Sequence, residues 1–268
     1  MPEFLSYPFM WRALAAGLVA GTVCSFLGIF VVLRKMAFFS AALSHAALAG
    51  IAIGLILGLD PDLSLIVFLV LVALGMGWVH NRTDLSPDSV IGVFFTGTMA
   101  LGVVLIGLQT GYRADFFAYL FGDILGVARE DLIWQGVLGA VVFGVLEGFL
   151  GRFVKIALNR DLAKAEGLRV EAYDYLFMVL ISLTVAISMK VLGALLVAAL
   201  LILPSAAAKN LGQNLRQLFL LALLFSLLSV IVGLAGSFYL NAASGPSIVL
   251  TLSLIFLLSL FGRRLLHP

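Results

Sequence analysis

Residues 9–33 read FMWRALAAGLVAGTVCSFLGIFVVL, in which Arg12 is the only charged side chain. About 20 consecutive apolar residues are enough for a helix to cross the hydrocarbon core of a bilayer. No positively charged segment precedes this run, as one would in a cleavable signal peptide. We therefore expect residues 9–33 to remain in the protein as its first transmembrane helix.

The rest of the chain repeats this pattern of continuous apolar runs separated by short polar segments. Of the 268 residues, 63% are hydrophobic and 11% are charged, whereas an ordinary soluble domain has roughly 25% charged residues. This composition excludes a soluble enzyme, a nucleic-acid binder and a disordered chain, and the continuous runs argue against a β-barrel, whose strands alternate. The sequence predicts an all-α polytopic membrane protein, one domain over residues 1–268 with eight to nine transmembrane helices. The further apolar runs are 38–58, 63–79, 89–109, 132–151, 173–189, 192–208, 217–240 and 247–262.

Basic residues predict how the chain is oriented. Lys and Arg cluster after the first, third, fifth, seventh and ninth runs, so that two runs separate each cluster from the next. Cytoplasmic loops are enriched in Lys and Arg. We therefore expect nine spans, with the N-terminus outside and the C-terminus inside. The clusters are Arg34 and Lys35; Arg82; Arg152, Lys155, Arg160, Lys164 and Arg169; Lys209 and Arg216; Arg263 and Arg264.

Residues 173–208 do not fit one straight helix. At 1.5 Å per residue such a helix would be about 54 Å long, well beyond a hydrocarbon core of roughly 30 Å. We expect two short helices that are broken near Lys190–Gly193, with Pro204 kinking the second. Broken helices in membranes line protein or water-filled cavities, which makes Lys190 a candidate residue of a translocation path.

His45 is the only histidine inside an apolar run. Ionisable groups within a membrane span are costly, and each is a candidate functional residue. An imidazole at this position either binds a divalent metal ion or hydrogen-bonds to a neighbouring helix. Both interpretations stay open at this point.

Residues 112–131 are too apolar for a plain loop and too short to cross the membrane twice. We expect an interfacial or re-entrant segment on the outer side. Asp123, flanked by apolar residues, is a candidate for facing protein or water, whereas Asp115 and Asp131 are expected to be solvated or paired with Arg113 and Arg129.

The longest inner segment, about residues 155–172, contains a short amphipathic helix that ends at Gly167. A helix of this kind suits the docking of a cytoplasmic partner, and a simple connector has the same pattern. His80, Asp84 and Asp88 are expected in a short inner loop. No G-x-x-x-x-G-K-[ST] motif occurs, so this chain does not bind ATP in a P-loop.

Several motifs resemble the membrane permeases of the zinc/manganese/iron ABC importer family, and they occur in the same order. Together they extend over nearly the whole chain, and the likeness is strongest to the zinc uptake permeases. The motifs are Arg34-Lys35-Met36 with Leu43-Ser44-His45-Ala46-Ala47-Leu48-Ala49-Gly50, Ala118-Tyr119-Leu120-Phe121-Gly122-Asp123, Asp161-Leu162-Ala163 with Gly167, Met189-Lys190-Val191-Leu192-Gly193-Ala194-Leu195-Leu196, and Ser244-Gly245-Pro246-Ser247-Ile248-Val249-Leu250.

This resemblance implies a type II ABC importer fold in the bacterial inner (plasma) membrane. It implies a homodimer in membrane lipid, with two cytoplasmic ATPase subunits and an extracytoplasmic metal-binding protein. The chain itself would be no enzyme and would bind no cofactor; ATP would be bound by the partner, and the cargo would be a divalent metal ion, zinc above the others. The path would pass His45, with Asp123 near the outer gate. ATPase coupling would involve Asp161, Leu162, Ala163 and Gly167.

One position departs from the family pattern. Many members have an acidic residue one helical turn before the histidine, and here that residue is Ala41. The alternatives to a zinc permease are a manganese or iron permease of the same family, a permease for chelated iron or cobalamin, a secondary metal transporter driven by protons or sodium, and a membrane-embedded enzyme. A secondary transporter should show more paired carboxylates in its spans, and the enzyme has no visible nucleophile–base pair.

Overall fold

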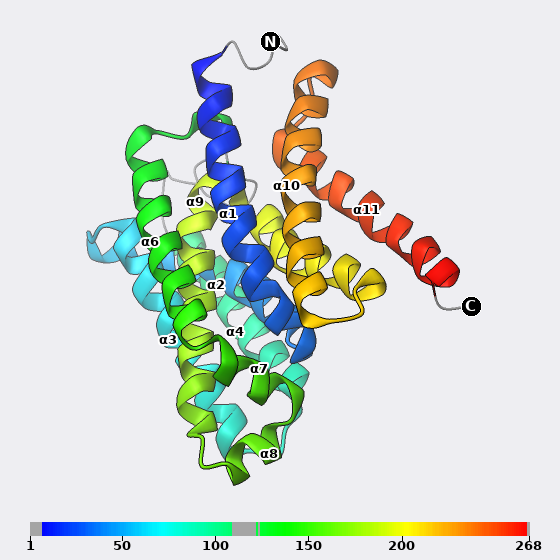
Figure 1. Ribbon diagram of the computed structural model, residues 1–268. Coiled ribbons are helices and arrows are strands. Elements are labelled where there is room, and N and C mark those ends of the chain that lie inside the picture. The colour runs from blue at the N-terminus through cyan, green and yellow to red at the C-terminus, as the bar shows by residue number, and fades with distance from the viewer. Residues whose placement is uncertain (1–6, 109–121, 123, 267–268) are drawn as a thin grey trace.

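The computed structural model describes residues 7–108, 122 and 124–266, and this part of the chain contains helices and no strands. Eight of these helices are long and apolar enough to cross a membrane, judged by length and composition. Figure 1 shows them as a bundle with the short helices α7 and α8 at one end. The helices are α1 (Pro8–Leu33), α2 (Ala37–Leu57), α3 (Pro61–Arg82), α4 (Pro87–Leu108), the short 3₁₀ helix η2 (Ile124–Gly126), α6 (Arg129–Gly148), α7 (Leu150–Leu158), α8 (Arg160–Ala165), α9 (Val170–Leu211), α10 (Leu215–Leu240) and α11 (Ser244–Leu266).

Local sequence signals explain where several helices begin and end. Pro61 occupies the first turn of α3, where its missing N–H costs nothing, and the Asp60 side chain accepts a hydrogen bond from the Leu63 amide at 2.8 Å. Gly58 ends α2 in the left-handed conformation, with a φ of 66°. The apolar runs predicted from the sequence therefore match the observed helices to within a few residues.

The helix α9 lies at the centre of the bundle and packs against α1, α2, α3, α10 and α11. Its backbone is helical from Val170 to Leu211 except at Gly193, where φ is 78° and ψ is 160°. The expected break near Lys190–Gly193 is confirmed. Pro204, which was expected to kink the second helix, lies inside this second helical part.

Contacts to α1 show that the chain reverses direction at this break. Asp174, in the first arm of α9, pairs with Arg34 directly after α1. Ala208, in the second arm, packs with Ile29 and Leu33 at the same end of α1. The two arms of α9 therefore run in opposite senses, and counting them separately gives the nine predicted apolar runs.

Ion pairs gather distant segments at each end of the bundle. Lys190 joins Asp62 and Asp131 at one end, whereas Arg34, Arg160 and Asp174 meet at the other. Tyr7 and Phe238 place the start of α1 beside the last turn of α10, with ring centroids 5.9 Å apart. This alternation of ends agrees with the crossing pattern predicted from the basic clusters, and we name the ends "outer" (Lys190) and "inner" (Asp174) accordingly.

Two details of the prediction were wrong, and one helix was missed. His80 and Asp88 do not lie in a loop, because α3 continues through Arg82 and Pro87 begins α4 at its first position. Asp131 pairs with Lys190 and not with Arg129, because α6 begins at Arg129 and brings Asp131 into its first turn. The nine-residue helix α7 at the inner end was not predicted.

Candidate translocation path and coupling segment

His45 lies in the middle of α2, on a side that the rest of the chain leaves half-buried. Its ring meets the edge of Phe95 from α4, with centroids 5.1 Å apart and planes at 89°. The His45 Nδ1 atom is buried, and no described residue forms a hydrogen bond with it. The interpretation of His45 as a histidine hydrogen-bonded to a neighbouring helix therefore finds no support in the geometry of Nδ1.

Ala41 lies one turn before His45 and is half-buried on the same side of α2. Residues i and i+4 share a helix face, so a carboxylate at position 41 would stand beside the imidazole, and the methyl group of alanine supplies no ligand. Among the residues that the structure describes, no three His, Cys, Asp or Glu side chains are placed so that they could hold a metal ion.

His45 contacts α4 through Phe95, and much of α4 is exposed apolar surface. Along this helix Val93, Met99 and Val103 are exposed large apolar side chains, and a Cβ on Gly97 would meet nothing within 4 Å. An apolar face of this kind is covered by lipid or by a second protein chain. The half-buried His45 therefore contacts a helix whose exposed apolar side chains a second copy of the chain could cover.

Lys190 lies at the outer end of α9, directly before the break at Gly193. Its ammonium group donates to Asp62 at 2.7 Å and lies 3.1 Å from Asp131, so it connects α3, α6 and α9. These residues and Asp60 line a cavity of about 430 Å³. With three carboxylates and one ammonium group, this outer cavity carries net negative charge.

Asp123 and most of the expected outer segment, residues 112–131, lie outside the described residues. The described part begins at Gly122, which has a φ of 67°. A Cβ built on Gly122 would collide with the amide nitrogen of Gly193 and the carbonyl of Leu192. The chain next to Asp123 therefore packs directly on the break in α9.

The candidate coupling segment forms the predicted short helix at the inner end. Asn159 caps α8, accepting hydrogen bonds from the amides of Asp161 and Leu162 at 3.1 and 3.0 Å. After α8, Gly167 adopts a φ of 82°, and the Leu168 amide donates to the Ala163 carbonyl at 3.1 Å. These interactions are typical of a helix that is closed at both ends.

The four predicted coupling residues differ in exposure. Leu162 is 59% exposed, whereas Ala163 is 2% exposed and packs with Ile156 and Val170. Asp161 and Gly167 are exposed, and a Cβ on Gly167 would meet nothing within 4 Å. Leu162 can therefore touch a partner directly, while Ala163 anchors α8 to α7 and α9.

Asp174 was missed by the sequence reasoning. Its carboxylate is 8% exposed and lies 2.9 Å from both Arg34 Nη1 and Arg160 Nη2, so it connects the end of α1 and the start of α8 to α9. The signal was present, because an aspartate at position 174 lies inside an apolar run and needs a cationic partner there.

Comparison with known proteins identifies the family. The model of the family described as "ABC 3 transport family" matches residues 6–263. The chain belongs to this family. It is a multi-pass membrane permease of the bacterial inner membrane, as the sequence motifs predicted.

Two proteins with known names are similar to this chain over almost its whole length. The chain is 36% identical over 258 residues to the "High-affinity zinc uptake system membrane protein ZnuB" of Haemophilus influenzae, covering 96% of this chain and 99% of that protein. It is 35% identical over 259 residues to the "Manganese transport system membrane protein MntC" of Halalkalibacterium halodurans, covering 97% and 89%. The two identities are almost equal although the two names differ in the metal.

Solved structures confirm the fold expected for an ABC importer permease. A chain of "PsaBC from Streptococcus pneumoniae in complex with Fab" superposes with a TM-score of 0.84 at 34% identity, covering 96% of this permease and 94% of that chain. An inward-facing putative metal-chelate type ABC transporter superposes with a TM-score of 0.74 at 16% identity, which shows the fold alone.

Proposed function

We propose that this permease carries divalent metal ions, zinc in particular, into the cytoplasm as the transmembrane subunit of an ATP-binding cassette importer. Two copies of the chain form the pore, with 1–268 as a single transmembrane domain. A separate ATPase docks at the inner end, and a metal-binding protein delivers the ion at the outer end. Membership of the ABC 3 transport family is the observation that carries this proposal.

The preference for zinc rests on the ligand chemistry at His45. Imidazole suits zinc, whereas manganese favours carboxylate, carbonyl and water ligands. His45 supplies an imidazole, and Ala41 has no carboxylate to offer. Two His45 side chains, one from each copy, would face each other across the dimer axis and form a transient nitrogen site that releases its ion readily.

The negative charge of the outer cavity supports import, in which the metal ion enters from the outer end. Asp60, Asp62 and Asp131 outnumber the single ammonium group of Lys190, and a cleft lined by one sign of charge raises the local concentration of ions of opposite charge. Lys190 itself repels a cation, so we assign it the role of holding three helix ends together beside the path. Asp123 would add negative charge at the outer gate.

Transport in proteoliposomes tests this function. The permease would be reconstituted with its ATPase and its metal-binding protein, and uptake of radioactive zinc would be measured with and without ATP, in competition with manganese and iron. We expect ATP-dependent zinc uptake that manganese competes with only weakly. Manganese uptake that exceeds zinc uptake would support the manganese alternative. Metal uptake that does not depend on ATP but depends on a proton or sodium gradient would contradict an ABC importer.

His45 is tested in the same assay. We expect His45→Ala to lower zinc uptake by roughly tenfold, equivalent to about 1.4 kcal/mol, without preventing assembly with the ATPase. Ala41→Asp should tighten zinc binding and slow its release, because a carboxylate then joins the imidazole. The matched control is His267→Ala, which removes a histidine outside the apolar runs. Wild-type uptake by His45→Ala would show that this histidine is structural.

A further inference from the structure

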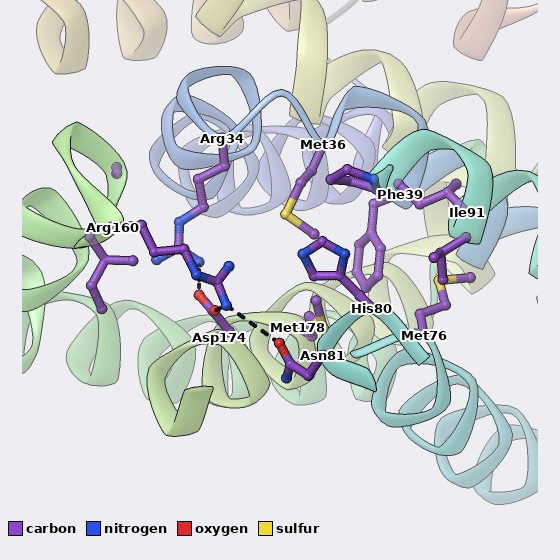
Figure 2. A pocket seen from close by; sticks show the side chains of 14 residues that line it. Arg34, Met36, Phe39, Met76, His80, Asn81, Ile91, Arg160, Asp174 and Met178 are labelled. Carbon is purple, nitrogen blue, oxygen red and sulfur yellow. Dashed lines mark hydrogen bonds and ion pairs between the residues drawn. The ribbon is translucent and has the colours of Figure 1, made fainter. Parts of the chain in front are cut away.

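A second cavity, of about 240 Å³, lies at the inner end of the bundle. Figure 2 shows Arg34, Arg160 and Asp174 together on one side of this cavity and the ring of His80 on the other. These side chains come from the turn after α1 and from α8, α9 and α3. Neither the proposed path past His45 nor the exposed side chain of Leu162 uses this cavity.

The charges that line the inner cavity do not balance. One carboxylate, Asp174, serves two guanidinium groups, with Oδ1 2.9 Å from Arg34 Nη1 and Oδ2 2.9 Å from Arg160 Nη2. Arg160 also donates to Asn81 Oδ1 at 3.4 Å. The side chains of Arg34 and Asp174 are 9% and 8% exposed, and that of Arg160 is 38% exposed. The cluster of two cations and one anion carries a net charge of about +1, and a charge on its buried members, Arg34 and Asp174, is costly unless it is fully paired.

Arg34 also has unused hydrogen-bond donors. Only Nη1 reaches Asp174, while Nε and Nη2 are buried and form no hydrogen bond with any described residue. Nε and Nη2 form one edge of the planar guanidinium, with parallel N–H groups that match two oxygens of a carboxylate or phosphate. The ring of Phe177, with its centroid 4.6 Å from Arg34 Cζ, holds the guanidinium in place.

Buried donors without partners are uncommon in native proteins, and each calls for an explanation. A water molecule could satisfy the donors of Arg34, but it would leave the positive charge of the cluster. An anion would accept hydrogen bonds from these donors and would also balance the positive charge of the cluster. A divalent cation is disfavoured here, because both guanidinium groups would repel it.

We propose that the inner cavity binds a phosphate-type oxyanion, held by the Nε and Nη2 edge of Arg34 and by Arg160. The oxyanion is either free phosphate from the cytoplasm or the headgroup of an anionic lipid of the inner leaflet; basic pockets between helices on this side of a membrane are suited to such headgroups. Since Arg160 begins α8 and Arg34 follows α1, a bound oxyanion would connect the coupling segment to the spans. This inference does not depend on which metal the permease carries.

Thermal unfolding of the full-length permease tests the site. Trp78 lies in α3 near the cavity, and tryptophan fluorescence can report the melting midpoint. One arm adds inorganic phosphate to protein in neutral detergent, against sodium chloride of equal ionic strength. The other arm compares nanodiscs of phosphatidylcholine alone with nanodiscs that also contain phosphatidylglycerol. We expect the wild-type midpoint to rise by roughly 3–6 °C in at least one arm.

Substitutions that keep the charge but remove the planar fork give the decisive comparison. Arg34→Lys should lose most of the upward shift in melting midpoint. Arg82→Lys, which changes an exposed arginine at the inner end of α3, should keep the whole shift. If Arg34→Lys does not fold, Arg160→Lys takes its place in the comparison. A shift with phosphate alone identifies a free anion, and a shift with phosphatidylglycerol alone identifies a lipid headgroup. No shift in either arm, or an equal shift in the cavity variant and in Arg82→Lys, would overturn the proposal.

Discussion

Asp174 shows how much one side chain depends on its surroundings. Its carboxylate is almost fully buried between Arg34 and Arg160, so Asp174→Asn leaves two guanidinium groups facing each other without an anion. Breaking a buried pair in this way costs about 3–5 kcal/mol. We expect Asp174→Asn to lower the melting temperature of the purified permease strongly.

The outer end offers a matched control for Asp174. Asp62 pairs with Lys190 at a similar distance, 2.7 Å, but its side chain is 42% exposed. Exposed pairs contribute about 0–1 kcal/mol because water and salt screen them. Asp62→Asn should therefore change the melting temperature little. Equal losses from the two substitutions would show that burial does not set the strength of these pairs.

At the scale of the element, the break in α9 depends on two glycines that touch each other. Gly193 has backbone angles that only glycine adopts readily, and Gly122 leaves no room for a Cβ against the peptide between Leu192 and Gly193. We expect Gly193→Ala or Gly122→Ala to destabilise the permease by about 2–3 kcal/mol, measured as a lower melting temperature. Gly136→Ala is the control, because a Cβ there meets nothing within 4 Å in the helix α6. It should be neutral or stabilise by up to ~1 kcal/mol; a control that destabilises as much as the other two would contradict this account of the break.

At α8, the proposed coupling helix, effects on docking and effects on folding can be tested separately. Leu162→Asp changes an exposed side chain and leaves the packing of Ala163 intact, so we expect it to weaken co-purification with the ATPase and to reduce transport without loss of thermal stability. Ala163→Glu and Gly167→Pro should also uncouple transport, but Ala163→Glu places a carboxylate among Ile156 and Val170 and should lower the melting temperature too. Unchanged ATPase co-purification and metal uptake in Leu162→Asp would exclude α8 as the docking site.

At the scale of the whole molecule, the orientation in the membrane can be tested by cysteine labelling. Cys24 is the only cysteine and is fully buried in α1, so Cys24→Ala gives a clean background. In intact cells an impermeant thiol reagent should label Ala242→Cys, in the turn between α10 and α11. It should label Lys164→Cys, in α8, only after the cells are opened. Labelling of position 164 in intact cells would contradict the nine-run topology.

The sequence alone predicted the apolar helices and their limits to within a few residues, because long apolar runs have no stable place other than the bilayer. It also predicted the break near Gly193, because residues 173–208 are too long for one span, and it predicted α8 from its amphipathic pattern and its end at Gly167. The resemblance in its motifs led to the ABC 3 transport family. These properties are all encoded over short stretches of chain, where local chemistry dominates.

Only the tertiary structure decided which charged groups meet. Asp174 lies 140 residues from Arg34 along the chain, and Lys190 lies 128 residues from Asp62. No local pattern connects such positions, because their pairing depends on how α9 folds back at Gly193 and on which helix ends it brings together. For the same reason, the structure and not the sequence showed that Ala163 is buried while Leu162 is exposed. The structure also showed that two nitrogen atoms of Arg34, Nε and Nη2, form no hydrogen bond with any described residue. Packing of distant segments sets the burial of each charge, and burial sets what that charge can do.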